Sequence, residues 1–472
     1  MLLLTLTNLG LVAGAVAAAA TSLKVVTIGT TPDGTTAPIR GWNSWGTQAG
    51  KYLSDADYNE GHVRGICDRL AGDLRGNYRL CGLDSGWSVG DHGDDHGRIS
   101  YDDSRFDIPR FARYLHGKKL LIGIYIVPGA FLNDFNKTIE GTNTKISDIC
   151  GATNGLARCR LKYDHPDTEK WIDSNARQFA SWGVDYIKLD FITPGSNDNG
   201  VDLPPDESPE VQLWHRAIAK TGRRMTLAIS WKLDRSKPYF DIWRANADSM
   251  RVDQDIQSYS RTPFTDWSRV LRTLGNYLEW INAAVAHEYY SDHHRAGSGG
   301  GGIGTHPNLD TMYVLNNGTL SGLSLDQRRS VFIHWIGSSA ELNLGDDLEQ
   351  PDPDGLALLN DHDALAAAGF TANYPMQPRN PGSGGNAWLA QNAWIAGPAP
   401  SGEFIVVLAN YDDGDAGTQT KTVSASFADL GVSGKYTCFD VFGKKSVTTQ
   451  SGLSVSLKGG QSVMYRCTRA KH

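Results

Sequence analysis

The chain has 472 residues, so a typical domain size of about 150 residues allows two or three domains. Hydrophobic residues make up 40% of it and charged residues 21%, a composition that excludes a largely disordered protein, a collagen and a coiled coil. The net charge of −7, without any basic run, argues against a nucleic-acid partner, while 52 glycines, 13 tryptophans and 18 tyrosines indicate many tight turns and flat apolar surfaces that suit sugar rings.

The N-terminal segment is the first element that the sequence predicts. Residues 2–20 are apolar apart from Thr and Asn, and they end in a run of small residues. This pattern predicts a signal peptide over residues 1–20, with cleavage near Ala18–Ala20. A membrane anchor is the alternative, because the segment lacks a positively charged start and nearly reaches spanning length. The Ala-rich end favours cleavage, so we expect a secreted, extracellular protein without membrane contact after cleavage.

From residue 38, apolar runs alternate with helical patterns. One helix is predicted from Asp167, as its N-cap, to a stop at Gly183, and another begins with a capping box of Ser324 and Gln327. The strands are predicted at 39–45, 78–83, 120–127, 184–191, 225–230, 249–253, 311–315 and 340–344. Alternation of this kind implies a parallel sheet, and eight units between residues 36 and 375 predict an α/β fold, a (β/α)₈ TIM barrel. An open doubly wound sheet has the same periodicity and is the alternative.

After residue 385 the helical patterns vanish. Short β-rich runs follow, separated by Gly, Asp and Ser turns, at 387–395, 404–410, 421–427, 436–440, 453–457 and 462–466. They predict a C-terminal antiparallel β-sandwich domain over residues 386–472, joined to the barrel by the Pro/Gly/Asn stretch 374–386. We expect this domain to cap the barrel, although carbohydrate binding is also open.

The cysteine count is even, which allows fifteen disulfide connectivities. Clustering along the chain suggests the pairs Cys67–Cys81, Cys150–Cys159 and Cys438–Cys467. No CxxC motif occurs, which argues against a zinc ribbon or a redox motif. Asn136 and Asn317 begin N-glycosylation sequons, and with the leader they favour secretion.

Polar residues follow several predicted strands at the point where each apolar run stops. In a parallel barrel, those carboxyl ends carry the chemistry. The residues are Trp45, Asp84, Ser85, Tyr125, Lys188, Asp190, Ser230, Trp231, Arg251, Asp253 and Asp255. Carboxylates with tryptophans fit glycoside hydrolysis, in which one carboxylate attacks the sugar and another protonates the leaving oxygen. Each aspartate could instead cap the helix that follows it.

A metal site is a competing interpretation. The loop Asp91-His92-Gly93-Asp94-Asp95-His96 holds acids and histidines that could bind a divalent cation, and His293-His294 and Asp361-His362-Asp363 are weaker candidates. We favour a solvated loop at 91–96, because its residues are hydrophilic turn formers. We therefore expect neither a metal ion nor a cofactor.

Several motifs together resemble glycoside hydrolase family 27, the α-galactosidases and α-N-acetylgalactosaminidases. Gly41–Trp45 is similar to the family's GWNSW, Gly123–Tyr125 to its GIY, Trp182–Asp190 to its WGVDYLKxD, Arg251–Ile256 to its RxxxDI, and Pro307–Met312 to a frayed NDPDM. The similarity runs from Gly41 to about Cys467. It implies a (β/α)₈ barrel with a C-terminal antiparallel β-domain, and retention of the anomeric configuration through a covalent glycosyl-enzyme.

The resemblance also implies residue roles. Asp190 would be the nucleophile, and the spacing from Arg251 makes Asp255, rather than Asp253, the acid/base. Lys188 could keep the nucleophile ionised. The glycone would be oriented by Trp45, Asp84, Tyr125, Lys188 and Arg251.

The sequence departs from the family pattern at sugar-binding positions. Ser85 stands where the family usually has the second acid of a DD pair, which removes a charged acceptor for the C4 and C6 hydroxyls. Ser230 stands where galactosidases often have an acid near the 2-hydroxyl, which resembles the galactosaminidase branch, although Leu233 is larger than that branch prefers. Met250 replaces an aromatic residue before Arg251.

We expect a secreted retaining exo-α-glycosidase that hydrolyses terminal α-galactosyl residues of an oligosaccharide or glycoconjugate. The alternatives on the same scaffold are an α-N-acetylgalactosaminidase, a β-L-arabinopyranosidase and an isomalto-dextranase-type enzyme. A catalytically silent carbohydrate-binding protein and a metal-dependent hydrolase that uses residues 91–96 are the other classes.

Overall fold

A computed structural model describes most of the chain, at residues 23–195, 201–259, 263–289, 302–379, 392–412 and 420–470. The predicted signal peptide, His293-His294, most of the predicted linker and the start of the run at 387–395 lie outside the described residues. No helix within those described ranges is long and apolar enough to cross a membrane.

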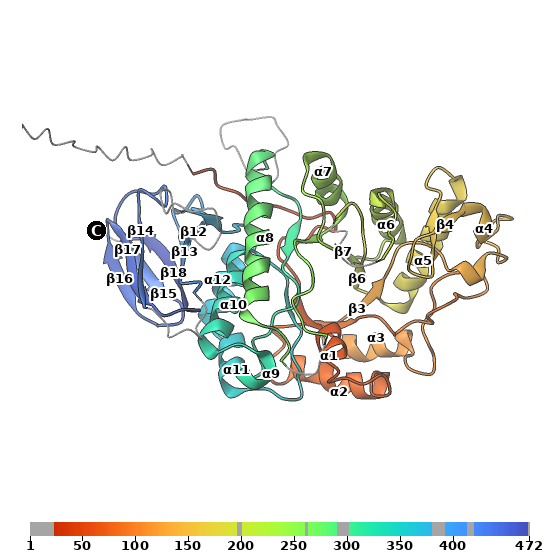
Figure 1. The fold of residues 1–472 in the computed structure, drawn as a ribbon, viewed down its shortest axis with the longest axis horizontal. Helices are drawn as coiled ribbons and strands as arrows, with labels where there is room; N and C mark the ends of the chain where they lie inside the picture. The colour runs from red at the N-terminus through yellow and green to blue at the C-terminus, as the bar shows by residue number, and fades with distance from the viewer. Residues whose placement is uncertain are drawn as a thin grey trace, which may run out of the picture.

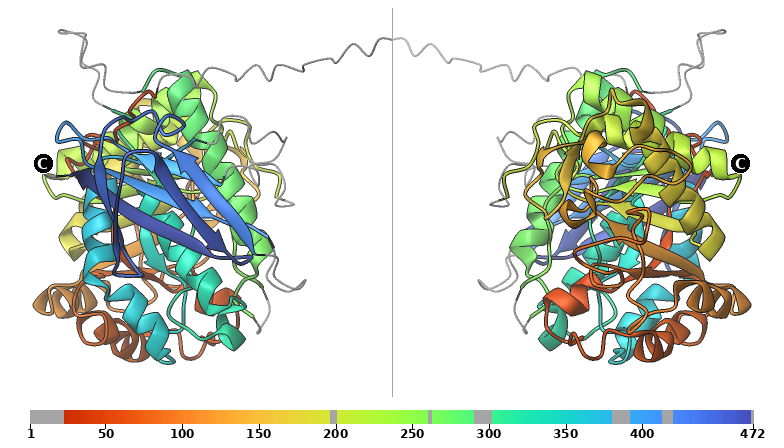
Figure 2. Two further views of the ribbon diagram at one scale, coloured as in Figure 1. Left: turned by 90° about the vertical axis from the view of Figure 1, so that its left-hand side faces the viewer. Right: turned by 90° about the vertical axis from the view of Figure 1, so that its right-hand side faces the viewer.

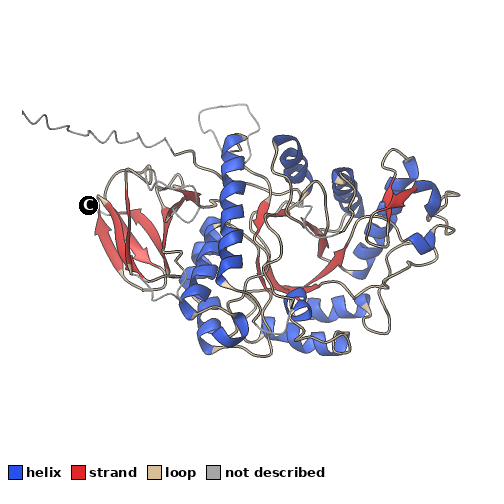
Figure 3. Ribbon diagram, in the orientation of Figure 1, coloured by secondary structure: helices blue, strands red, loops and turns tan. Residues whose placement is uncertain are grey.

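Eight parallel strands form one curled sheet, in the order β10-β1-β2-β3-β6-β7-β8-β9 (Figure 3). The strands are short and largely buried, as expected where helices cover a parallel sheet. They are β1 (Arg40–Asn43), β2 (Leu80–Leu83), β3 (Leu121–Ile126), β6 (Tyr186–Leu189), β7 (Thr226–Ile229), β8 (Ser249–Arg251), β9 (His306–Asn308) and β10 (Leu342–Leu344). The predicted TIM-like barrel is confirmed, and the open doubly wound alternative is wrong.

One predicted strand was misplaced. The expected run at 311–315 is buried loop, and the strand is β9, five residues earlier. The side chain of Asp346 accepts hydrogen bonds from the backbone of Val314 and Asn316, which substitute for a strand partner. Only Met312 forms an isolated parallel bridge, to Leu344 of β10. The sequence of β9, His-Pro-Asn, has none of the β-branched residues that signal a strand.

The helices surround the sheet and follow the predicted alternation (Figure 1). Those of the barrel region are α1 (Trp45–Ala49), α2 (Glu60–Ala71), α3 (Ile108–Gly117), α4 (Ile146–Ile149), α5 (Pro166–Trp182), α6 (Ser208–Thr221), α7 (Lys237–Asn246), α8 (Trp267–Ala286), α9 (Gly318–Ser321), α10 (Leu325–Gly337), α11 (Pro353–Leu359) and α12 (His362–Thr371), with a 3₁₀ turn at Leu132–Asp134. Cys150–Thr153 (β4) and Cys159–Leu161 (β5) form a separate hairpin.

The helix ends test two sequence predictions. The capping box of Ser324 and Gln327 is present at the start of α10. Asp167 is not the N-cap of α5, because Pro166 already occupies the first helical position, where its fixed φ suits a helix start. Gly183 ends α5 in the left-handed region at φ 90°, as glycine does most readily.

The C-terminal part contains two antiparallel sheets, which confirms the predicted β-domain. One has the order β11-β12-β13-β18-β15-β16 and the other pairs β14 with β17. The strands are β11 (Gln377–Pro378), β12 (Ala393–Ala396), β13 (Phe404–Ala409), β14 (Lys421–Ser426), β15 (Tyr436–Asp440), β16 (Ser446–Thr449), β17 (Gly452–Leu457) and β18 (Ser462–Arg469). The prediction missed β16, an exposed edge strand without apolar alternation, and the two-residue β11.

The C-terminal part packs on α8 and α10, and Figure 2 (left) looks onto its outer face. Trp394 and Met464 belong to the same apolar cluster as the barrel core. Tyr411 accepts a hydrogen bond from Trp394 Nε1 at 2.6 Å and lies 2.9 Å from His334 Nε2 of α10. This continuous core agrees with a capping role.

The three disulfides are those that clustering suggested: Cys67–Cys81, Cys150–Cys159 and Cys438–Cys467. The first joins α2 to β2, the second closes the β4–β5 hairpin, and the third joins β15 to β18.

Candidate active site

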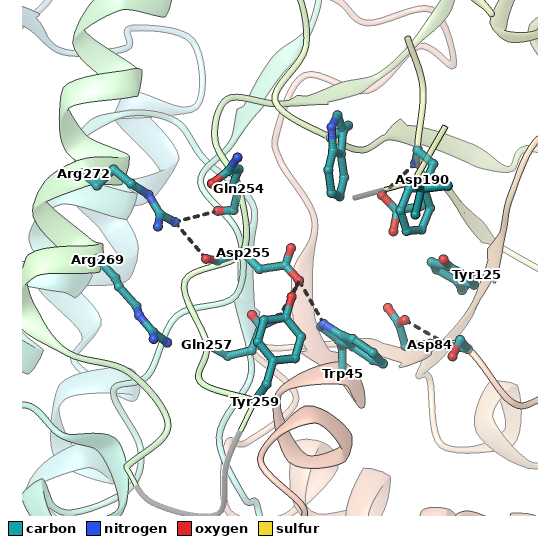
Figure 4. A pocket seen from close by; sticks show the side chains of 14 residues that line it. Trp45, Asp84, Tyr125, Asp190, Gln254, Asp255, Gln257, Tyr259, Arg269 and Arg272 are labelled. Carbon is teal, nitrogen blue, oxygen red and sulfur yellow. Dashed lines mark hydrogen bonds between the residues drawn. The ribbon is translucent and has the colours of Figure 1, made fainter. Parts of the chain in front are cut away.

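A pocket of about 560 Å³ lies at the carboxyl ends of the barrel strands (Figure 4). The sequence-predicted residues that line it are Trp45, Asp84, Ser85, Tyr125, Asp190, Trp231 and Asp255. Lys188, Ser230 and Arg251 were also predicted for the site, but they do not line the pocket. Lys188 and Arg251 bind the lining residues Asp84 and Asp255, and Ser230 binds Arg251. The fold thus gathers side chains from segments more than 200 residues apart.

Asp190 lies directly after β6 and is 9% exposed. Its backbone N–H donates to Ile126 O of the neighbouring strand at 3.0 Å, which continues the sheet and fixes the residue. Oδ1 accepts a hydrogen bond from the backbone of Phe191 at 2.9 Å, and Phe191 adopts a left-handed φ of 58°. The carboxylate of Asp190 is therefore held at the pocket surface by backbone geometry.

Asp255 faces the pocket from the side opposite Asp190 (Figure 4). Oδ1 accepts a hydrogen bond from Arg251 Nη2 at 2.6 Å. Oδ2 accepts from Trp45 Nε1 at 3.1 Å, Gln257 Nε2 at 2.7 Å and Tyr259 Oη at 2.6 Å. Burial raises the pKa of Asp255, but the charges of Arg251 and Lys188 outweigh burial and hold this pKa well below its ordinary value.

Arg251 connects Asp255 to a second buried acid, Asp310. Its Nη2 lies 2.9 Å from Asp310 Oδ2, and the same oxygen accepts the backbone N–H of Ile256 at 2.8 Å. Asp310 therefore holds both the arginine and the backbone next to Asp255. Burial raises the pKa of Asp310 although Arg251 opposes it. Asp310 itself adopts a left-handed φ of 70°.

Asp253, the other acid of this segment, turns away from the pocket. It is 1% exposed, and its Oδ2 accepts hydrogen bonds from Arg272 Nε at 2.8 Å and Thr273 Oγ1 at 2.7 Å, both on α8. Asn276 donates to Oδ1 at 2.9 Å. Asp253 thus fastens the segment to α8, which leaves Asp255 as the acid that faces the cavity.

Lys188 forms an ion pair with Asp84 rather than with Asp190. Its Nζ, on β6, lies 2.8 Å from Oδ2 of Asp84, which follows β2, two strands away in the sheet. Burial lowers the pKa of Lys188, but Asp84 and Asp190 outweigh burial, so this pKa lies above its ordinary value and the amine stays charged. The sequence placed Lys188 beside the attacking carboxylate, whereas the structure gives its direct contact to the sugar-binding candidate.

Ser230 does not reach the pocket. It is buried, and its Oγ accepts a hydrogen bond from Arg251 Nη1 at 3.3 Å. The next residue, Trp231, adopts a φ of 116° and stacks on Phe191 with ring centroids 5.0 Å apart. Phe191 and Trp231 therefore line the part of the pocket where the sequence analysis predicted Ser230.

Sequence reasoning missed several lining residues, which are Phe191, Val201, Gln254, Gln257, Tyr259, Arg269 and Arg272. Most follow a strand by more than one residue or lie on α8, so the search at strand ends did not cover them. Tyr259, four residues after Asp255, is the most exposed of them at 63%. A search for tyrosines near the predicted acids would have found it.

The side chains of the loop 91–96 contact one another, Arg98 and the segment around Thr138. His92 Nδ1 lies 2.7 Å from Asp91 Oδ1, Asp94 pairs with Arg98 at 2.7 Å, and His96 Nδ1 lies 3.0 Å from Thr138 O. Within the part of the chain that the structure describes, no group of three or more His, Cys, Asp or Glu side chains is placed to hold a metal ion.

Comparison with known proteins gives matches over most of the chain. The family model described as "Alpha galactosidase A" matches residues 152–369, and "Alpha galactosidase C-terminal beta sandwich domain" matches residues 390–467. Alpha-galactosidase 3 of Hypocrea jecorina is 37% identical over 467 residues, which are 95% of this chain and 73% of that protein. Putative alpha-galactosidase 8 of Emericella nidulans is 35% identical over 417 residues, or 84% and 80% of the two chains.

Solved structures at lower identity share the fold. A β-L-arabinopyranosidase of Geobacillus stearothermophilus, in complex with arabinose, has a TM-score of 0.74 at 19% identity and covers 93% of this chain and 98% of its own. The isomalto-dextranase of Arthrobacter globiformis T6, complexed with panose, has a TM-score of 0.72 at 19% identity, with 96% and 76% covered.

Proposed function

Because the chain belongs to the α-galactosidase family of glycoside hydrolases, family 27, we propose that it is a secreted, retaining exo-enzyme that removes terminal α-galactosyl residues from oligosaccharides or glycoconjugates. The observation that carries the mechanism is that Asp190 and Asp255 face one pocket from opposite sides (Figure 4). Paired carboxylates across a sugar-sized pocket are what glycoside hydrolysis requires.

Asp190 is the nucleophile in this proposal. Its carboxylate oxygen forms a bond to the anomeric carbon while the bond from that carbon to the glycosidic oxygen breaks. The Phe191 N–H donates to Oδ1 at 2.9 Å and so fixes the direction of attack. Lys188 contributes a nearby positive charge, although its direct contact is with Asp84.

Asp255 is the acid and then the base. It gives its proton to the departing glycosidic oxygen. In the second step it takes a proton from a water whose oxygen bonds to the anomeric carbon, while the bond from that carbon to the Asp190 oxygen breaks and frees the carboxylate. In the structure this carboxylate accepts hydrogen bonds from several donors, which stabilise its charged form. To act as an acid, it must therefore gain a proton when the substrate occupies the pocket. The glycosidic oxygen and the sugar replace solvent there, which weakens the stabilisation of the charged form.

The glycone is held by groups around these acids. Trp45 offers an indole face to the C–H side of the sugar, and Asp84, fixed by Lys188, accepts hydroxyl protons. Tyr125 lines the floor, and Arg251 acts from behind by aiming Asp255.

Ser85 supports one second candidate, a β-L-arabinopyranoside. This sugar lacks the hydroxymethyl group that a second acid at this position would recognise. Replacement of that acid by Ser85 therefore weakens the binding of a β-L-arabinopyranoside less than the binding of an α-galactoside. A hydrogen bond to a charged group contributes about 1.5–3 kcal/mol, enough to change the preferred sugar. A silent binding protein is less well supported, because binding alone requires no pair of opposed carboxylates.

The test is a panel of p-nitrophenyl glycosides with the wild type, Asp190→Asn and Asp255→Asn. We expect the wild type to hydrolyse the α-galactoside and each variant to lose orders of magnitude in kcat. Proton NMR of the first-formed sugar should show the α-anomer, as retention requires. Release of the β-anomer, or near-full activity of Asp190→Asn, would contradict the mechanism.

We also propose a division of the chain into a signal peptide at 1–20, a catalytic barrel at 36–375 and a β-sandwich domain at 386–472. The disulfides support passage through the secretory pathway, where such bonds persist. Mass spectrometry of the secreted protein would locate its mature N-terminus.

A further inference from the structure

Two N-glycosylation sequons in the barrel region have no part in the reaction proposed above. Asn136–Thr138 and Asn317–Thr319 are the only Asn-x-Ser/Thr sequences of the chain. In a protein that passes through a eukaryotic secretory pathway, the asparagine of such a sequence accepts an N-linked glycan where the folded surface leaves room for it. Each site therefore depends on the surroundings of the amide nitrogen, Nδ2.

The amide of Asn317 is held with its nitrogen free. The side chain is exposed, and its Oδ1 accepts hydrogen bonds from the backbone of Thr319 at 3.0 Å and of Leu320 at 3.2 Å. Because both partners are donors, the atom that faces them is the oxygen, and Nδ2 occupies the other branch of the amide. Within the described ranges, this nitrogen has no hydrogen-bond partner.

The preceding residue, Asn316, shows the opposite arrangement. It is fully buried, and its Nδ2 donates to Asp347 O at 2.8 Å and to Gln350 O at 2.7 Å. Asn316 thus anchors the segment, and its amide has no room for a glycan. It is also outside a sequon, so the sequence and the structure select the same one of two adjacent asparagines.

Asn136 lies in a turn of the long segment between β3 and α5. Its side chain is exposed and makes no hydrogen bond with another residue that the structure describes. The residues beside it hold the turn in place. Lys137 Nζ donates to Gly93 O at 2.8 Å, and Thr138 forms an antiparallel bridge to Lys145. The turn is therefore fixed while the amide of Asn136 stays available.

Both sequons follow strands whose carboxyl ends surround the pocket. Asn136 comes after β3 and Asn317 after β9, which are the fourth and eighth strands in the order of the sheet. Strands four positions apart in an eight-strand barrel lie on opposite sides of it. Neither asparagine lines the pocket, so groups attached to them leave it open.

We propose that Asn136 and Asn317 are both attachment sites for N-linked glycans, on opposite sides of the barrel. The inference rests on the proposed secretion, since the transfer takes place in the secretory pathway, and it is independent of the glycosidase mechanism.

In the transfer, Nδ2 forms a bond to the anomeric carbon of the first N-acetylglucosamine of a lipid-linked oligosaccharide diphosphate. The bond from that carbon to the diphosphate oxygen breaks, and the lipid diphosphate leaves with the electron pair. One proton of Nδ2 passes to a base of the host transferase. Oδ1 of Asn317 remains a carbonyl oxygen, so its two backbone hydrogen bonds persist after the transfer.

The test is mass spectrometry of the full chain secreted by a yeast host. Peptide N-glycosidase in oxygen-18 water converts each glycosylated asparagine into a labelled aspartate, and we expect the label at Asn136 and Asn317 in most molecules. A parallel digest without the glycosidase measures spontaneous deamidation, to which an Asn-Gly sequence such as Asn317–Gly318 is prone. Equal label in the two digests would overturn the site concerned.

Variants assign each glycan to its sequon. Thr138→Val and Thr319→Val each destroy one sequon and keep its asparagine, so each should remove one step of the electrophoretic shift. Asn317→Asp keeps the oxygen that accepts from the backbone and replaces Thr319→Val if that variant is not secreted. Asn133→Gln, at an exposed position outside a sequon, is the matched control and should keep both glycans. A sequon variant that keeps the full shift would overturn its site.

Secretion and glycosylation fail in different ways. If no protein reaches the medium, the proposed secretion is wrong, and a proven signal peptide placed before Met1 then delivers the full chain to the same pathway. Unlabelled Asn136 or Asn317 in disulfide-bonded protein recovered from the medium would overturn that site, whatever the protein hydrolyses.

Discussion

The phenol of Tyr259 donates a 2.6 Å hydrogen bond to Oδ2 of Asp255, the carboxylate that the proposed mechanism requires as a proton donor. Gln257 and Trp45 donate to the same oxygen, so in this state the oxygen is fully occupied as an acceptor. A proton can rest on Oδ2 only after at least one donor withdraws or reverses. Tyr259 is the most exposed of the three, and its hydroxyl can rotate so that it accepts a hydrogen bond from the protonated carboxyl instead of donating one.

Tyr259→Phe should therefore raise the pKa of Asp255, because it removes a hydrogen bond that stabilises the charged form. The alkaline limb of the profile of kcat/KM against pH should move up by about one unit. Tyr239→Phe removes a hydrogen bond from a tyrosine to Asp206, a pair that does not line the pocket, and should leave the profile unchanged. An unmoved limb in a folded Tyr259→Phe enzyme would contradict the assignment of Asp255 as the acid.

Asp310→Asn should lower kcat about 100-fold with little change in KM, because Arg251 loses its buried counter-charge and Asp255 is no longer aimed. Breaking a buried ion pair also costs stability, of the order of 3 kcal/mol. Steady-state kinetics and chemical denaturation measure the two effects. Asp326→Asn breaks a half-buried pair with Arg329 at the start of α10 and serves as the control. If both variants behave alike, Asp310 has no positioning role.

Ser85→Asp should raise kcat/KM for the α-galactoside about tenfold relative to the β-L-arabinopyranoside, because the new carboxylate accepts a hydroxyl that only the hexose has. The ratio of the two rates is the readout, since it cancels changes in folded fraction. Ser85→Asn adds similar bulk without charge and should give a smaller gain. An unchanged ratio would show that this position does not select the sugar.

Several buried carboxyls should make the protein more stable at acid pH. Burial raises the pKa of Glu207 to about 9, of Glu210, Asp248 and Glu341 to about 7, and of Asp346 to about 6. Between their ordinary values and these raised values the folded state binds more protons than the unfolded state, so the free energy of unfolding falls as pH rises. Tm should therefore be lower at pH 8 than at pH 5.

Glu207→Gln tests this expectation at one site. Glu207 Oε2 is buried without a hydrogen-bond partner among the described residues, so an uncharged amide should raise Tm at pH 8 and change it little at pH 4. Glu288→Gln, at an exposed position, should leave Tm unchanged at both values. A Tm that rises steadily from pH 5 to pH 8 in the wild type would contradict the raised pKa values.

The sequence by itself predicted the alternating strands and helices, the C-terminal β-domain and the disulfide pairs, while the family resemblance favoured the barrel over an open sheet and Asp255 over Asp253 as the acid. These depend on local patterns, because strand runs, helix periods and motif spacings are set by neighbours in the chain. It misplaced β9, whose His-Pro-Asn sequence forms a strand only because β8 pairs with it.

Only the tertiary structure decided which groups meet. Lys188 pairs with Asp84 of a distant segment, Ser230 supports Arg251 from behind, and Asp253 is bound by α8 while Asp255 stays free to face the pocket. Trp45 and Tyr259 are 214 residues apart in the sequence, yet both donate hydrogen bonds to the carboxylate of Asp255. Both residues also line the main pocket and a smaller cavity beside it. Contacts of this kind depend on how the strands curl and where the loops fold back. Local periodicity in the sequence therefore does not predict them.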